Sequence, residues 1–161
     1  MHGRTFNLLL AFFCHELLIA AYYFQYVVGL NPCPLCIIQR VVVFALAVWF
    51  LVLAAINAKP GTLMAKLVNG IGVLISLAGV AAAGRQVWLQ SLPPADIPAC
   101  GPSLEYMMDV FSANEILAEL LKGSGDCAKV DWTLLGFSMG AWMLVAFSLF
   151  ALMFLWRALR K

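Results

Sequence analysis

The chain has 161 residues, of which 64% are apolar and only 11% are charged. Soluble domains carry about a quarter charged residues, so this composition, with a mean hydropathy of +0.95, predicts an integral membrane protein with one domain over residues 1–161. The net charge is only +2, and no Lys/Arg run or basic–aromatic pattern points to nucleic-acid binding.

Four apolar stretches reach the roughly 20 residues that a membrane-spanning helix needs. In chain order they cover about residues 7–28, 37–56, 67–89 and 133–156. The first is too long for the apolar segment of a signal peptide, and no A-x-A-like cleavage site follows it, so we expect it to be retained. The sequence therefore predicts an all-α four-helix membrane bundle with loops at about 29–36 and 90–132.

The charges predict an orientation, because basic residues near span ends mark the cytoplasmic side. If both termini are cytoplasmic, one side collects Arg4, Lys59, Lys66, Arg157, Arg160 and Lys161. Seven of the eight acidic residues lie between positions 91 and 131 instead. The loops at about 29–36 and 90–132, which contain four of the cysteines, then face the outer, oxidising compartment, where disulfides persist.

Small residues in two spans predict close helix packing. The third span has a small face made of Gly72, Ser76 and Gly79, and Gly136 and Gly140 form a G-x-x-x-G at the start of the fourth. We favour contacts within one bundle, and a homodimer seam is the alternative.

The long loop is predicted to contain short structure of its own. Prolines keep the segment around Cys100 extended. Two amphipathic helices should follow on the membrane surface, with a small soluble cap as the alternative. The first has apolar residues at helical spacing, and the second begins at a Ser112/Glu115 capping box and ends near Gly123. The two apolar stripes are Leu104, Met107, Met108 and Phe111, then Ile116, Leu117, Leu120 and Leu121.

Four cysteines lie outside the apolar runs. Cys33 and Cys36 form a C-P-L-C motif at the start of the second span, and Cys100 and Cys127 lie in the long loop. A C-x-x-C suits a small disulfide or two ligands of a metal. A zinc site formed by all four is disfavoured, since the second pair is not a C-x-x-C. Four cysteines allow three disulfide connectivities.

Arg40 follows Cys36 by one helical turn. A helix N-terminus favours a thiolate at Cys36, and an arginine at membrane depth is a functional candidate. We expect it to pair with that thiolate or with the polar head of a cofactor, with snorkelling to headgroups as the alternative.

Four other polar or reactive residues lie in or near the spans. Cys14 is expected to be an inert buried group, and Arg85 to anchor at headgroups. His15 and Glu16 are interpreted as paired with polar groups inside the bundle, with a proton path as the alternative.

Two segments carry a specific family resemblance. The first runs from Phe24-Gln25 through N-P-C-P-L-C at residues 31–36 to Gln39-Arg40. The second is G-S-G-D-C at residues 123–127, followed by Trp132, Leu135 and Gly136. With four spans around them, these segments resemble the DsbB family of bacterial inner-membrane disulfide-forming oxidases.

This resemblance implies an enzyme, a quinone-dependent thiol oxidoreductase that re-oxidises a DsbA-like periplasmic partner. Cys100 would form the mixed disulfide with the partner, and Cys127 would then attack Cys33. Cys36 would pass electrons to a bound quinone (ubiquinone or menaquinone) near Arg40. The resemblance implies the bacterial inner membrane, and we expect a monomer with both termini cytoplasmic and both cysteine loops periplasmic.

Two other functions remain open. One is a vitamin-K-epoxide-reductase-like thiol oxidase, which is disfavoured because in that family the loop cysteines precede the C-x-x-C. The other is a non-catalytic membrane scaffold, with Cys100 and Cys127 as a structural disulfide and the C-x-x-C as a metal ligand.

Overall fold

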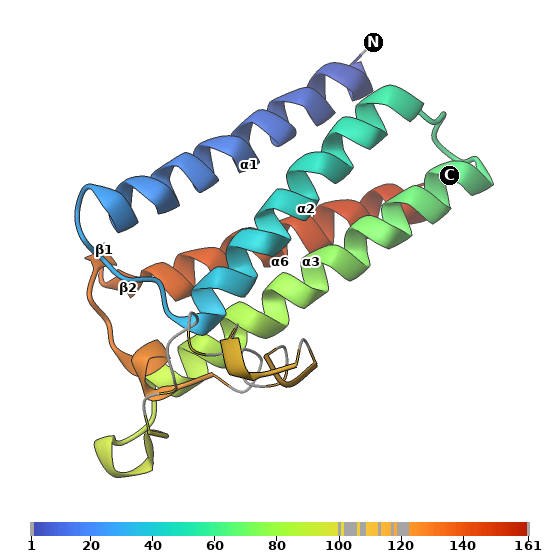
Figure 1. Cartoon of the computed structure of the whole chain (residues 1–161). Helices are drawn as coiled ribbons and strands as arrows, with labels where there is room; N and C mark the ends of the chain where they lie inside the picture. The colour runs from blue at the N-terminus through green and yellow to red at the C-terminus, as the bar shows by residue number, and fades with distance from the viewer. Residues whose placement is uncertain are drawn as a thin grey trace.

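Four long helices form the body of the protein (Figure 1). The computed structural model describes residues 2–99, 101, 106, 109–112, 114–116, 118 and 123–160, so Cys100 lies outside the described residues. The helices are α1 (His2–Tyr26), α2 (Pro34–Ile56), α3 (Leu63–Gln90) and α6 (Met139–Leu159). Each is long and apolar enough to cross a membrane, which confirms the predicted all-α bundle.

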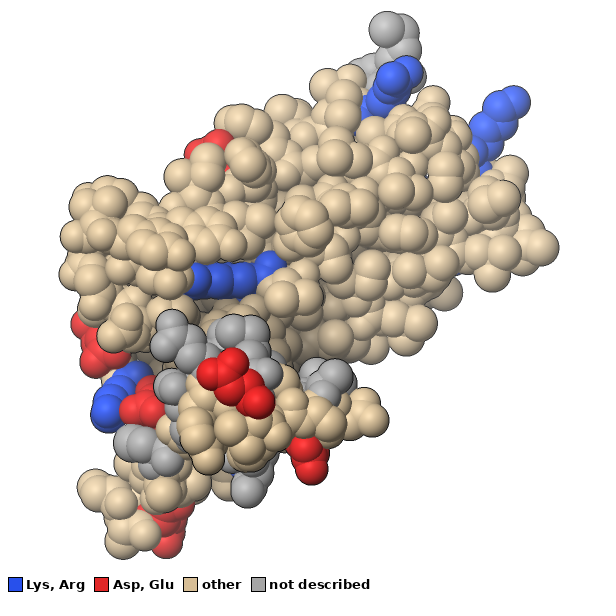
Figure 2. Space-filling view, in the orientation of Figure 1, with Lys and Arg blue, Asp and Glu red and all other residues tan. Residues whose placement is uncertain are grey.

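The two ends of the bundle differ in their loops and in the charge of their side chains. Both termini and the α2–α3 connection lie at one end, and the remaining loops lie at the other (Figure 1). Acidic side chains gather at the loop end and basic ones appear at the end with the termini, with a mostly uncharged belt between them (Figure 2). This arrangement matches the charge asymmetry expected from the sequence.

The fourth long helix begins later than the expected position 133. A two-residue strand β1 (Thr133–Leu134) pairs antiparallel with β2 (Phe137–Ser138). Leu135 and Gly136 connect the strands with φ of 53° and 82°, as a tight hairpin turn with two positive φ angles requires. Ser138 then caps α6, its Oγ accepting from the Ala141 N–H at 3.3 Å. The expected helical G-x-x-x-G is therefore wrong, since Gly136 belongs to the turn.

The small face of α3 packs as predicted, within the bundle. A Cβ added at Gly72 would come within 2.7 Å of the Phe154 ring, and one at Gly79 within 2.5 Å of the Phe147 ring. Ser76 between them is fully buried. The absence of side chains at these two glycines lets aromatic rings of α6 lie directly on the α3 backbone.

The long loop contains short 3₁₀ helices η1 (Pro94–Asp96) and η2 (Gly125–Ala128). The predicted capping box is present: the Ser112 N–H and hydroxyl both donate to Glu115 Oε2 at 2.8 Å, and these bonds lower the pKa of Glu115. Gly123 has a φ of +74°, as expected for a helix stop. Much of the two predicted stripes lies outside the described residues, namely Leu104, Met107, Met108, Leu117, Leu120 and Leu121.

Candidate redox-active site

The C-P-L-C motif forms the N-terminus of α2. Cys33 is the N-cap residue in extended conformation, Pro34 follows in the first turn, and Cys33 Sγ accepts from the Cys36 N–H at 3.3 Å. The two sulfurs lie 2.7 Å apart. Proline is well suited to this position because its missing N–H would have no partner in the first turn. The free N–H groups of a helix start carry partial positive charge and favour thiolates.

Cys127 from the long loop joins the same helix N-terminus. It is fully buried, in a cluster with Cys33, Leu35 and Leu89. The pKa of Cys127 falls to about 6, mainly because the Cys33 thiol donates a hydrogen bond to the Cys127 sulfur. The Leu35 N–H also donates to the Cys127 sulfur. The same contact with Cys127 raises the pKa of Cys33. Three of the four predicted site cysteines thus lie together.

The chain on both sides of Cys100 contacts the residues just before Cys127. The Gly125 N–H donates to Ala99 O at 3.2 Å, and a Cβ added at Gly101 would lie 3.1 Å from Ser124 Cβ. A Cβ at Gly125 would lie only 2.3 Å from Pro98 O, so glycine is required for this approach. The contacts of residues 97–99 and 101 with residues 123–125, here called the loop strap, bring the flanks of Cys100 close to Cys127.

A cavity of about 340 Å³ opens beside the sulfurs, between the helices. Cys33, Cys36 and Arg40 line it, together with apolar side chains that include Leu17, Leu18, Phe24, Val43 and Met143. Apolar walls with a few convergent polar groups are typical of sites for organic ligands, which usually start at about 300 Å³.

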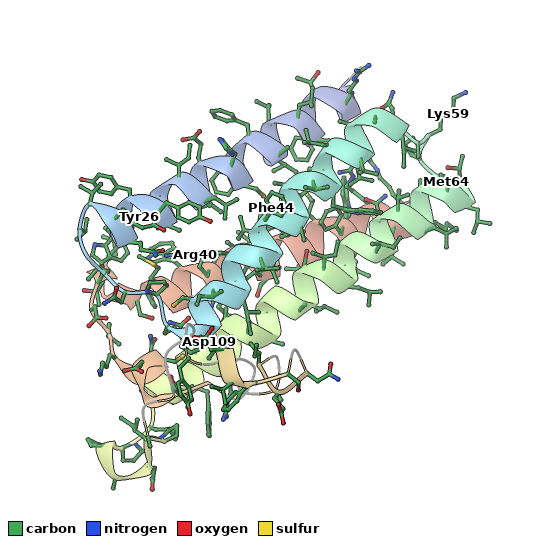
Figure 3. All side chains as sticks on the ribbon, in the orientation of Figure 1. Tyr26, Arg40, Phe44, Lys59, Met64 and Asp109 are labelled. Atoms are coloured by element: carbon green, nitrogen blue, oxygen red, sulfur yellow. The ribbon has the colours of Figure 1, made fainter. Side chains whose placement is uncertain are left out.

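Arg40 borders this cavity but is anchored on α1. Its Nη2 donates to Ala21 O at 3.1 Å, its Nη1 donates to Gln25 Oε1, and its guanidinium lies 5.4 Å from the centre of the Tyr22 ring. Figure 3 shows the side chain between α1 and α2. The hydrogen bonds described for Arg40 therefore go to α1. Arg40 and Cys36 both line the cavity.

Two buried glutamines at the site, Gln39 and Gln86, were given no role there from the sequence. Gln39 Nε2 donates to Gln86 Oε1 at 2.7 Å. Gln86 Nε2 in turn lies 3.3 Å from Cys36 Sγ and 3.7 Å from Cys33 Sγ. Polar residues inside otherwise apolar spans are the signal that could have revealed them.

The remaining candidates are not among the residues that line the cavity. Cys14 is fully buried, as expected. The interpretation of His15 and Glu16 as paired inside the bundle is wrong, because both side chains are on the exposed face of α1. Arg85 packs over the Trp88 ring, 4.2 Å from its centre. Among the described residues, no group of three or more His, Cys, Asp and Glu could hold a metal ion.

Comparisons with known proteins agree with this geometry. Residues 3–157 match the family described as "Disulfide bond formation protein DsbB". Disulfide bond formation protein B of Methylococcus capsulatus is 48% identical over 98% of this chain and 97% of its own length. The proteins of that name from Nitrosococcus oceani and Azoarcus sp. are 44% and 41% identical, covering 91% and 89% of this chain and 85% of their own length in each case. The chain therefore belongs to the DsbB family of membrane-embedded disulfide bond formation proteins.

Proposed function

We propose that this protein re-oxidises a periplasmic DsbA-like dithiol protein and passes the two electrons to a membrane quinone. One observation carries the proposal: Cys127 of the loop and Cys36 of the C-P-L-C both lie against Cys33, beside an apolar cavity. A disulfide can therefore be exchanged between the two cysteine pairs at one point.

Electrons should enter at Cys100. Cys127 is fully buried, so a partner thiolate cannot reach its sulfur in this conformation, whereas Pro98 and Ala99 beside Cys100 are exposed. Attack on a Cys100–Cys127 disulfide would join Cys100 to the partner and release Cys127 as a thiolate. The second partner thiol would then attack that mixed disulfide, leaving the partner oxidised and Cys100 reduced.

The next exchange takes place at the N-terminus of α2. The Cys127 thiolate attacks Cys33 of a Cys33–Cys36 disulfide, so that the Cys33–Cys127 bond forms and Cys36 leaves as a thiolate. The helix N-terminus stabilises negative charge at this position. Attack of Cys100 on Cys127 restores the loop disulfide and leaves Cys33 and Cys36 reduced, holding the two electrons taken from the partner.

A quinone fits the cavity by size and chemistry. The cavity is mostly apolar, it includes Cys36 at its wall, and it has the cationic Arg40 to face a ring oxygen. When bound, a quinone supplies an acceptor for two electrons and two protons. Cys33 and Cys36 would give up two electrons and two protons as their disulfide re-forms, Arg40 would hold a ring oxygen, and the apolar walls would exclude water.

The proposed setting is the bacterial inner membrane, with both termini cytoplasmic and both cysteine loops periplasmic. The charge distribution supports it, since basic residues near span ends mark the cytoplasmic side. The match of residues 3–157 to the DsbB family favours this function over a vitamin-K-epoxide-reductase-like oxidase or a metal-binding scaffold.

The test is quinone reduction by the purified protein in detergent, followed by absorbance while a reduced DsbA-type protein is added. We expect turnover that is lost in Cys36→Ala and in Cys100→Ala. Cys14→Ala is the matched control, because that thiol is buried in a different core cluster from Cys33 and Cys127, and it should keep turnover. Cys36→Ala should still form a covalent adduct with the partner through Cys100. Normal turnover without Cys36 would contradict the proposal.

A further inference from the structure

Two amide side chains form a short chain of hydrogen bonds that ends on the sulfur of Cys36. Gln39 and Gln86 are only 4% and 5% exposed, and they come from different helices, α2 and α3. Burying two amides in a membrane bundle is costly unless they are paired. Here Gln86 pairs with Gln39 through its oxygen, and its nitrogen contacts the sulfur of Cys36.

We propose that Gln86 stabilises the Cys36 thiolate by donating an amide hydrogen to it, and that Gln39 is the positioning residue that fixes the orientation of the Gln86 amide. The role in turnover rests on the proposed function, in which Cys36 leaves Cys33 as a thiolate. The contact itself requires only that Cys36 becomes reduced.

The direction of the Gln86 amide follows from its partner. An amide has an acceptor oxygen and a donor nitrogen at its two ends. Gln39 Nε2 donates to Gln86 Oε1 at 2.7 Å, which turns Gln86 Nε2 toward Cys36 Sγ at 3.3 Å. A flipped Gln86 would place its oxygen against a thiolate and its nitrogen against the Gln39 nitrogen. With the Gln39 amide oriented as it is here, its nitrogen favours the Gln86 arrangement that stabilises an anion.

Packing against α6 restricts the same amide. A Cβ added at Gly140 would lie 3.0 Å from both Cδ and Oε1 of Gln86. The glycine thus leaves room for the amide next to α6, and little more. A donor fixed in advance in surroundings of low dielectric constant interacts strongly with a charge that appears nearby.

The contact gains strength at the moment of exchange. A thiol sulfur is a weak acceptor, and hydrogen bonds to ionised groups are about twice as strong as neutral ones. Departure of Cys36 as a thiolate therefore strengthens its bond to Gln86. Because the amide is neutral, it stabilises the thiolate without adding another positive charge at the cavity, which Arg40 also lines.

The test uses the full chain with Cys36 as its only cysteine, and measures the alkylation rate by iodoacetamide at pH 7. Gln86→Met keeps the side-chain length and removes the donor. We expect it to slow alkylation about tenfold, because fewer Cys36 side chains are thiolates. The matched control is Gln90→Met on the same helix, whose partner is Ser138, and its rate should stay within about twofold of the unsubstituted protein.

Gln39→Met tests the positioning role and serves if Gln86→Met fails to fold. It should slow alkylation by a smaller factor, and it should add nothing when combined with Gln86→Met, because Gln39 acts only through Gln86. With all cysteines present, Gln86→Met should lower the reduction potential of the Cys33–Cys36 pair by about 30 mV for a tenfold effect.

An unchanged alkylation rate in a folded Gln86→Met protein would overturn the role of Gln86. Independent, additive effects of the two substitutions would overturn the role of Gln39. Neither alkylation measurement uses a quinone or a partner protein, so their outcome is separate from that of the proposed function.

Discussion

Substitution of Gly125 should weaken the loop disulfide specifically. In Gly125→Ala the new Cβ would lie 2.3 Å from Pro98 O, and relief of that clash would break the Gly125–Ala99 backbone hydrogen bond. Overpacking costs about 1–3 kcal/mol and the lost bond about 0.5–1.5 kcal/mol. A Cys100–Cys127 disulfide would hold the loop strap closed against this strain, whereas the reduced loop can open and release it.

The disulfide should therefore become easier to reduce. A strain of about 2–4 kcal/mol corresponds to a rise of about 40–90 mV in the reduction potential of the Cys100–Cys127 pair. The assay is redox titration in glutathione buffers, with alkylation and mass spectrometry to count the loop thiols. Gly101→Ala, whose Cβ would lie 3.1 Å from Ser124 Cβ, should give a smaller rise. An unchanged potential in Gly125→Ala would refute the strap as the element that sets the stability of this pair.

Three further outcomes follow from the structure. Arg40→Ala should raise the KM for quinone at least tenfold, since a hydrogen bond to a charged group is worth about 1.5–3 kcal/mol. Steady-state quinone reduction measures this KM, and an unchanged value would exclude Arg40 from the quinone site. In a reduced Cys100→Ala protein, the reaction rate of Cys127 should reach half its maximum near pH 6, because the pKa of Cys127 is lowered to about 6. Further substitution of Cys33 should raise the pH of this midpoint. Reaction with a small thiosulfonate over a pH series measures both midpoints, and a Cys127 midpoint near pH 9 would contradict the lowered pKa. Gly79→Ala should destabilise the bundle by about 1–3 kcal/mol by overpacking against Phe147, seen as a lower Tm in detergent, whereas Gly70→Ala, with nothing within 4 Å, should not lower it.

The sequence predicts the bundle well because membrane spans depend on length and composition. Hydropathy located all four helices, and the sequence placed Cys36 near a helix start, although α2 begins at Pro34 rather than at about residue 37. The start of α6 was missed because residues 133–138 are apolar enough to continue a span. Their hairpin is fixed by local geometry instead, through the positive φ angles at Leu135 and Gly136.

Spacing predicted the site as a set of reactive groups, whereas the approach of Cys127 to Cys33 was implied only by the family resemblance. Spacing alone selected the cysteines and Arg40, and the roles assigned to them remain predictions to be tested. That Cys127 meets Cys33 could not be read from spacing, because it depends on how η2 packs on α2 and α3. The partners of Arg40 on α1 were missed for a similar reason: Ala21 contributes a backbone carbonyl, which leaves no signal in the side-chain sequence.

The anchoring of α1 connects the fold to the cavity. An arginine of another helix bonds α1 near each end: Arg157 of α6 donates to Asn7 at 2.8 Å, and Arg40 of α2 donates to Ala21 and Gln25. Both are charged donors in largely apolar surroundings, where such bonds are strong. The Arg40 contact lies at the cavity that also includes Leu17 and Leu18 of α1. Arg40 thus brings positive charge to the cavity and also holds one of its walls, so a ligand that draws the guanidinium toward itself must also act on the position of α1.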